Sequence, residues 1–224
     1  MFYFQRRLKK NWKKIHTSLT CKYYKLIKGS ETFKFQNVFY KYFIHEYNYT
    51  WENERIIEIP IIRRIVDKNM NSDILEVGNV LSHYFYFSHD VIDKYEKGEN
   101  VINADAANFK LKKKYNLIIS ISTLEHIGWD EEKRDPNKVL KAINNFKTHL
   151  KERGRIIFTH PLGYNPILDR YIKDGRINLK EKSLLKRISA SNEWQEVTWE
   201  QIFADIKYND PFPYANGIVF GMIQ

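Results

Sequence analysis

The sequence predicts an α/β fold, with a Rossmann-like, mostly parallel sheet of seven strands and helices on both faces. Two observations predict it: short apolar runs typical of buried strands recur after residue 70, and helical patterns lie among them. The strand-like runs are 73–79, 89–93, 100–104, 115–122, 155–160 and 218–223. A length of 224 residues suits one such domain plus an extension, and is too short for two full domains.

Three helices are predicted beside these strands. Residues 53–68 place isoleucines on one face, with an irregularity at Pro60. The clearest helix follows Asp135, a good N-cap, and Pro136, which suits the first helical position. A capping-box spacing precedes a short helix over 199–205.

Positive charge is concentrated at the N-terminus. The net charge is +10, yet residues 1–30 hold nine Lys or Arg and no acidic residue, which leaves 28 basic and 27 acidic residues elsewhere. An apolar stripe at spacings of four, three and four predicts an amphipathic helix there. The stripe consists of Leu8, Trp12, Ile15 and Leu19. This stripe would dock on an anionic membrane, or pack on the rest of the chain or on a second subunit of a homodimer.

The chain divides into a basic, aromatic N-terminal helical extension over residues 1–50 and one domain over residues 51–224. Residues 33–51 carry nine aromatic side chains, and we expect a helix or ordered loop that covers the domain or its substrate. No apolar run approaches the ~18 residues that cross a bilayer, and a leader peptide is not expected. The single cysteine, Cys21, excludes an internal disulfide. We expect a cytoplasmic protein, held peripherally at a membrane if the extension binds one.

Candidate functional residues follow the predicted strands, because ligands of open α/β sheets bind beyond the carboxyl ends of the strands. Glu76 and Gly78 end the first strand, and Asp93 ends the second, where an acidic side chain commonly binds the hydroxyls of a ribose. Asp105 follows the third strand and Ser122 the fourth. The first loop lacks the GxGxxG pattern of dinucleotide-binding dehydrogenases, which makes that class improbable.

These segments resemble the class I S-adenosylmethionine (SAM)-dependent methyltransferase family. The resemblance rests on ILEVGN at 74–79, Asp93, INADAANF at 102–109, YNLIISISTLEHIGW at 115–129 and GRIIFTHPLGYN at 154–165. NERIIEIP, LEVGNVLSHY and PFPYANGIVFG look more narrowly like small methyltransferases of glycan or polysaccharide synthesis. The chain departs from the family in having one glycine, Gly78, in the first loop, and too few residues before the second strand for a full helix.

The resemblance implies SAM as the cofactor and assigns a role to each candidate residue. The implied cofactor-binding residues are Glu76, Gly78 and Asn79 for the methionine part, Asp93 for the ribose, Asp105 and Ala106 for the adenine, and Ser122 beside them. The implied catalytic residues are His126, as the base that deprotonates a hydroxyl, and Glu125. The acceptor pocket would include Trp129, His160 and Tyr164. Each of these residues also has an ordinary structural alternative, such as a turn, a helix cap or core packing.

Three functions stay open at this point. The leading hypothesis is O-methylation of a sugar hydroxyl on a glycan, glycolipid or nucleotide sugar. An RNA methyltransferase that grips nucleic acid with its basic extension is less favoured, because the domain is nearly neutral. A non-catalytic SAM-fold subunit is the third. A divalent metal is also less favoured, since Ser122 stands where the metal-dependent relatives of the Glu125–His126 pair carry another glutamate.

Overall fold

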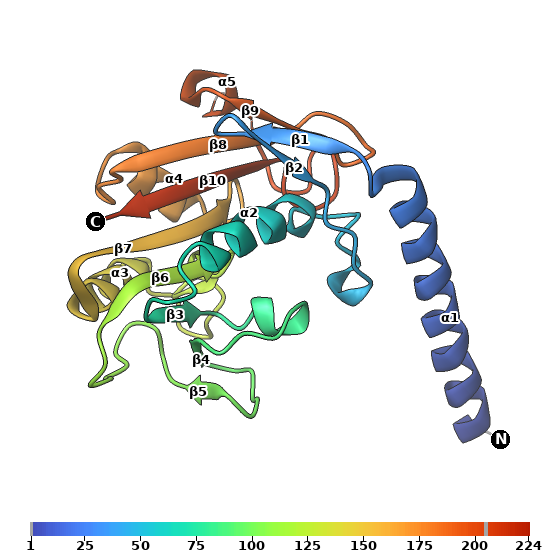
Figure 1. Ribbon diagram of the computed structural model, residues 1–224, viewed down its shortest axis with the longest axis horizontal. Coiled ribbons are helices and arrows are strands. Elements are labelled where there is room, and N and C mark those ends of the chain that lie inside the picture. Colours follow the sequence, from blue (N-terminus) through green and yellow to red (C-terminus); the bar gives the residue numbers. More distant parts are fainter. Residues whose placement is uncertain (1, 204–205) are drawn as a thin grey trace.

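The computed structural model describes the backbone of residues 2–203 and 206–224 and the side chains of residues 15–202 and 206–224. Its centre is an eight-stranded sheet with the order β5-β4-β3-β6-β7-β10-β8-β9 (Figure 1). The strands are β3 (Ile74–Val77), β4 (Asp90–Asp93), β5 (Val101–Asn103), β6 (Tyr115–Ile121), β7 (Leu150–Pro161), β8 (Glu181–Arg187), β9 (Trp194–Val197) and β10 (Gly217–Ile223).

Strands β5, β4, β3, β6 and β7 are parallel, in the order that characterises a Rossmann-like half-sheet. Strand β10 runs antiparallel to β7, and β8 and β9 continue the sheet in antiparallel pairs. The predicted fold class is therefore confirmed, but the count of seven strands is wrong. Strands β8 and β9 were not among the predicted runs, because in β8 only Leu184, Leu185 and Arg187 are buried, and in β9 only Trp194 is buried.

Helices cover both faces of the sheet, as predicted. On one face, buried isoleucines of α2 (Arg55–Asp67) pack with Leu117 and Ile119 of β6. On the other face, α3 (Lys138–Thr148) and α4 (Pro166–Lys173) pack with Ile118 and with β7. This division follows from the alternation of side chains along β6.

The helix boundaries differ from the sequence prediction at several points. Helix α2 continues through Pro60, whereas α3 starts at Lys138 because the Asp135 carboxylate first accepts the Asn137 N–H in a turn. Helix α4 was not predicted; the Asn165 side chain caps it by accepting the N–H groups of residues 167 and 168. Helix α5 (Trp199–Phe203) forms where expected, and residues 204–205 of that prediction lie outside the described residues.

The aromatic segment forms a β-hairpin, where the sequence analysis expected a helix or ordered loop. Strands β1 (Thr32–Phe35) and β2 (Val38–Lys41) pair through a two-residue turn, and a short 3₁₀ turn, η1 (Tyr47–Tyr49), follows. Phe33 and Phe35 alternate with exposed residues and enter the core, where Phe35 lies 4.7 Å from Phe220 between ring centroids. The period of two along β1 is thus the signal that predicts the strand.

Helix α1 (Phe2–Lys28) projects from the rest of the chain, with its N-terminal end farthest from the sheet (Figure 1). Of the predicted apolar stripe, Ile15 and Leu19 are exposed, and the side chains of Leu8 and Trp12 lie outside the described residues. In the described part of the chain, no helix is both long enough and apolar enough to span a bilayer.

Candidate functional site

A sharp turn at Gly78 begins the candidate site at the carboxyl end of β3. Gly78 has a φ of 90°, which only glycine adopts easily, and its N–H donates to the Ile92 carbonyl of β4. A Cβ atom at this position would lie 2.2 Å from Oγ1 of Thr123, which follows β6. The turn is therefore held against both neighbouring strands with no room for a side chain.

Replacing Gly78 with alanine is expected to lower the free energy of unfolding by about 2–4 kcal/mol, because strain at positive φ adds to the contact with Thr123. Gly175→Ala is the matched control: Gly175 also has a positive φ, of 73°, but a Cβ there meets nothing within 4 Å. Urea unfolding of both variants separates strain from contact. Equal losses for the two variants would show that Thr123 does not restrict Gly78.

The connection after Gly78 is fixed by a buried carboxylate. Only a short 3₁₀ turn, η2 (Leu81–His83), stands where a crossover helix would normally follow, as the sequence predicted. Oε1 of the fully buried Glu76 accepts the N–H groups of Val80 (2.9 Å) and Leu81 (2.8 Å), and its Oε2 lies 2.8 Å from Nε2 of His89. Both oxygens of Glu76 are thus engaged inside the protein, and its contact with a cofactor stays a prediction.

A cavity of about 350 Å³ opens beyond the ends of β3, β4 and β6, where the strand order reverses. The predicted site residues that line it are Gly78, Asn79, Asp93, Asp105, Ala106 and His126. The lining residues that the sequence analysis did not select include Lys94, Tyr95, Thr123, Ile127, Asp130 and Glu131. The predicted site residues that do not line it are Glu76, Ser122, Glu125, Trp129, His160 and Tyr164.

Asp93 joins the two loops that form one end of the cavity. Its Oδ2 accepts the N–H of Asn79 (3.0 Å), while its Oδ1 accepts those of Tyr95 (2.8 Å) and Glu96 (2.7 Å). An ionised carboxylate offers about four acceptor positions. Asp93 therefore retains one acceptor position beyond these three backbone bonds.

A network of ion pairs borders the same cavity. Oδ2 of Asp105 lies 2.9 Å from Nζ of Lys94 and 2.6 Å from Nζ of Lys138, and Glu131 pairs with both lysines. Burial raises the pKa of Asp105, but hydrogen bonds from Lys138, from the Ala107 N–H and from Lys94 lower it overall to about 2. Asp105 is consequently ionised at neutral pH, and its loop is held in place.

His126 and Asp130 form a hydrogen-bonded pair that also lines the cavity. His126 belongs to the 3₁₀ turn η3 (Leu124–His126) that follows β6, and its Nδ1 lies 2.5 Å from Oδ2 of Asp130. The Tyr164 hydroxyl donates to the same oxygen at 2.6 Å. Burial raises the pKa of Asp130, but these two hydrogen bonds lower it overall. Because the ionised carboxylate only accepts, Nδ1 carries a proton, and in the neutral imidazole Nε2 is then the acceptor.

A group of charged side chains lies behind this pair, and two of its members, Glu125 and His160, are buried. Oε1 of Glu125 is 3.8 Å from Nε2 of His126, and its Oε2 is 3.8 Å from Nδ1 of His160. Nε2 of His160 lies 2.7 Å from Oδ1 of Asp169 on α4. Burial lowers the pKa of His160, but the hydrogen bond with Asp169 and the adjacent Glu125 raise it overall to about 9. Oε2 of Glu125 and Nδ1 of His160 are buried without a hydrogen-bond partner.

Two further predicted residues point elsewhere. Ser122, with a φ of 37°, donates its hydroxyl to Oε1 of the buried Glu58 on α2 at 2.5 Å, so it faces that helix. The Trp129 ring lies 4.4 Å from the Arg134 guanidinium. Ligand contacts of Ser122, Trp129, His160 and Tyr164 stay predictions.

In the described ranges, His, Cys, Asp and Glu side chains form no group of three or more that could hold a metal ion. The sequence disfavours a divalent metal at Glu125 and His126, and assay with and without a chelator tests this expectation.

Comparisons with known proteins give structural matches alone. No protein-family model matches the sequence, and no curated protein matches it. A SAM-dependent methyltransferase from Clostridium acetobutylicum matches at 15% identity, over 72% of this chain and 88% of that one, with a TM-score of 0.41. The N-methyltransferase NodS from Bradyrhizobium japonicum, in complex with S-adenosyl-L-homocysteine, matches at 12% identity, over 75% and 89%, with a TM-score of 0.44. The sugar N-methyltransferase KedS8 from Streptoalloteichus matches at 12% identity, over 73% and 86%, with a TM-score of 0.36. All three are methyltransferases.

The cavity residues that were not predicted stand at recognisable positions in the sequence. Asp130 follows His126 by four residues, a spacing at which a carboxylate reaches an imidazole in a turn of helix. Thr123 follows Ser122, and the turn after β6 decides which of the two faces Gly78. Lys94 and Tyr95 directly follow the predicted ribose-binding Asp93.

Proposed function

We propose that the chain is a SAM-dependent O-methyltransferase that acts on a sugar hydroxyl of a glycan, glycolipid or nucleotide sugar. The observation that carries the proposal is one cavity lined by two groups of side chains. The Gly78 turn and the carboxylates of Asp93 and Asp105 form one group, and the His126–Asp130 pair forms the other. The first group suits a nucleoside, and the second suits removal of a proton.

The residues around the cavity fit SAM. The bare backbone at Gly78 allows close approach of a ligand. The free acceptor position of Asp93 suits a ribose hydroxyl, and Ala106 and Ile127 supply apolar surface for a flat ring. A volume of about 350 Å³ lies in the range of small-molecule sites, ~300–1,000 Å³. When bound, SAM would supply a methyl group made electrophilic by the neighbouring sulfonium charge.

The chain's own contribution to the reaction is removal of a proton and orientation of the acceptor. Nε2 of His126 accepts the proton of an attacking hydroxyl, while Asp130 holds the ring through Nδ1 and stabilises the imidazolium that forms. Tyr164 donates to Asp130 and fixes that carboxylate in turn. The Tyr164 ring packs edge-on against His126 with 4.9 Å between ring centroids, which helps to fix the imidazole in place.

Cofactor binding tests the first half of the proposal. Calorimetry is expected to detect binding of SAM and of S-adenosyl-L-homocysteine, and Asp93→Ala is expected to weaken both at least tenfold, because it removes a ribose ligand and loosens the Asn79 loop. Asp67→Ala is the matched control, since Asp67 is an exposed partner of Arg63 on α2. Failure of the unaltered chain to bind SAM would instead favour a non-catalytic subunit with a SAM-type fold.

Acceptor identity is a separate measurement. We expect the chain to transfer a labelled methyl group from SAM to nucleotide sugars or glycans. The label should be recovered as an acid-stable ether on oxygen. Label recovered on an amine of an amino sugar would keep the methyltransferase assignment and overturn O-methylation.

A further inference from the structure

We propose that helix α1 binds an anionic membrane surface through its exposed apolar face. Large apolar side chains are exposed along this helix, on a segment where the sequence places no acidic residue. They are Ile15 (57% exposed), Leu19 (60%), Tyr23 (58%), Leu26 (81%) and Ile27 (46%). Single exposed apolar residues are ordinary, but five within 13 residues of one helix form a continuous surface that marks an interaction site.

The apolar face points away from the rest of the chain. At 100° per residue, Leu19 and Leu26 lie within about 20° of each other, and Cys21 lies about 160° from Leu19 around the helix. Cys21 is buried, and Tyr24 stacks on Trp51 with 5.5 Å between ring centroids. The helix is therefore anchored on one side and leaves its apolar side open.

A second set of contacts fixes the C-terminal end of α1. The buried Lys28 donates to the Ser191 carbonyl at 2.5 Å and lies 4.5 Å from the centroid of the Tyr42 ring. These contacts exclude a rotation of the helix that would turn Leu26 inward. The alternative that the stripe packs on the chain's own core is thus wrong for Ile15 and Leu19.

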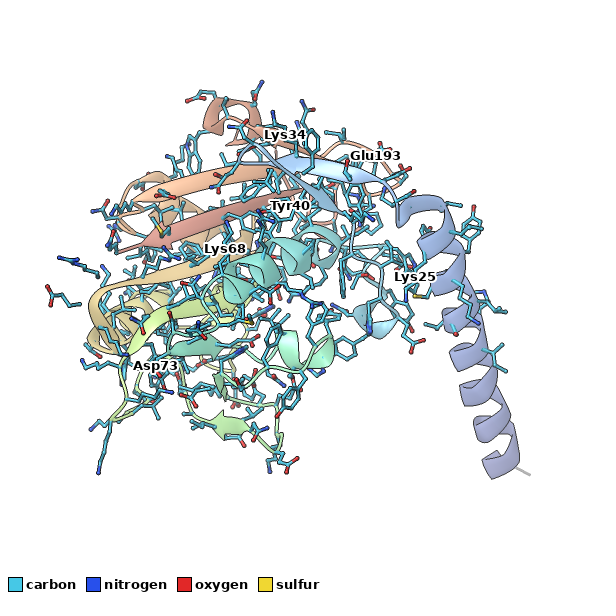
Figure 2. All side chains as sticks on the ribbon, viewed as in Figure 1. Lys25, Lys34, Tyr40, Lys68, Asp73 and Glu193 are labelled. Carbon is cyan, nitrogen blue, oxygen red and sulfur yellow. The ribbon has the colours of Figure 1, made fainter. Side chains whose placement is uncertain are left out.

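The positive charge of residues 1–30 indicates which partner binds the exposed apolar face of α1. Residues 1–30 carry nine basic side chains and no acidic one, so a second copy of the helix would bring like charges together along the whole contact. Anionic headgroups attract the same charges, and an apolar face with Lys and Arg around it is the pattern of helices that lie in a membrane interface. Lys22 and Lys25 are exposed, and Figure 2 shows Lys25 on the part of α1 nearest the sheet.

The shape of the molecule permits this docking. At 1.5 Å per residue, α1 is about 40 Å long, and Figure 1 shows most of that length beyond the sheet. The cavity lies at the ends of β3, β4 and β6, on the sheet and not on α1. Membrane binding and cofactor binding are therefore independent, and the proposal does not rest on methyl transfer.

Vesicle flotation with the full chain tests the proposal. The chain is expected to bind vesicles of 70% phosphatidylcholine and 30% phosphatidylserine at least tenfold more strongly than pure phosphatidylcholine at 0.1 M NaCl, and to lose most of this binding at 0.5 M NaCl. The double variant Leu19→Gln, Leu26→Gln is expected to reduce binding at least tenfold. Met70→Gln with Ile188→Gln is the matched control, because these exposed apolar side chains lie outside α1, and it is expected to bind as the unaltered chain does.

Three outcomes would overturn the proposal. The first is binding that does not depend on phosphatidylserine or on Leu19 and Leu26. The second is a stable dimer in sedimentation velocity that the double variant dissociates, with no vesicle binding, which would assign the face to a second copy. The third is retention of a single-stranded RNA of 30 nucleotides with no vesicle binding, which would assign the basic segment to nucleic acid.

Discussion

His126→Ala is expected to lower kcat about 10²–10⁴-fold while leaving the affinity for SAM within about twofold of the unaltered value. Removing the imidazole removes the proposed proton acceptor, and general-base catalysis contributes a factor of this size. Cofactor binding is spared because the Gly78 turn and the Asp93 loops hold no bond to the His126 ring. Single-turnover methyl transfer together with calorimetry measures both quantities on one preparation.

Asp130→Asn separates the base from the residue that positions it. An amide can donate to Nδ1, which would place the proton on Nε2 and leave the ring unable to accept one. The expected result is a kcat about 10²-fold lower, partly recovered at high pH as the hydroxyl loses its proton unaided. Asp174→Asn is a suitable control, because Asp174 lies at the end of α4 and not at the cavity.

Full turnover in His126→Ala would rule out the assignment of His126 as the base.

The sequence was most informative where an element is buried on both faces. Strands β3 and β6 are mostly apolar and almost entirely buried because helices cover both of their faces, and their ends located the cavity to within a few residues. The charge arithmetic likewise separated α1 from the rest of the chain. Strands β8 and β9 and the β1–β2 hairpin escaped prediction because side chains that are not buried interrupt their apolar residues.

Site contacts that depend on a local twist of the backbone could not be predicted. Ser122 and Thr123 are neighbours of similar chemistry, and only the positive φ of Ser122 sends its hydroxyl to Glu58 and leaves Thr123 against Gly78. His160 was predicted to bind substrate, yet it lies within β7 near its end and is fully buried. Its partner Asp169 lies on α4, a helix that was not predicted, so the ion pair could not be foreseen.

His160 is expected to make the stability of the protein fall as pH rises above neutrality. Its pKa is about 9 in the folded chain, against 6.5 ordinarily, so the folded state binds more protons than the unfolded state between these values. The stabilisation is complete below about pH 6.5 and is lost as pH rises through 9. Of a total of about 3 kcal/mol, about 2 kcal/mol should disappear between pH 7 and pH 9.

Urea unfolding of the unaltered chain and of His160→Gln over pH 7–9 measures this effect. The variant should be about 3–5 kcal/mol less stable at pH 7, because Glu125 and Asp169 lose the cation between them, and its stability should vary less with pH. Burial and the neighbouring Glu58 raise the pKa of Glu54 to about 7. Measuring above pH 7 therefore limits the contribution of Glu54 to the change of stability with pH.

His149→Gln provides the control for burial. His149 is also buried, but its Nδ1 lies 2.8 Å from the Asn145 carbonyl and its Nε2 accepts the Leu111 N–H, so no carboxylate faces it. This variant should lose stability by a similar amount at every pH in the range. If the stability of His160→Gln declines with pH as steeply as that of the unaltered chain, the decline does not come from His160. The His160 imidazolium would then not be the group that holds the Glu125 carboxylate behind His126. The position of that carboxylate would then have to come from the bond that the Asn165 side chain donates to the Glu125 carbonyl.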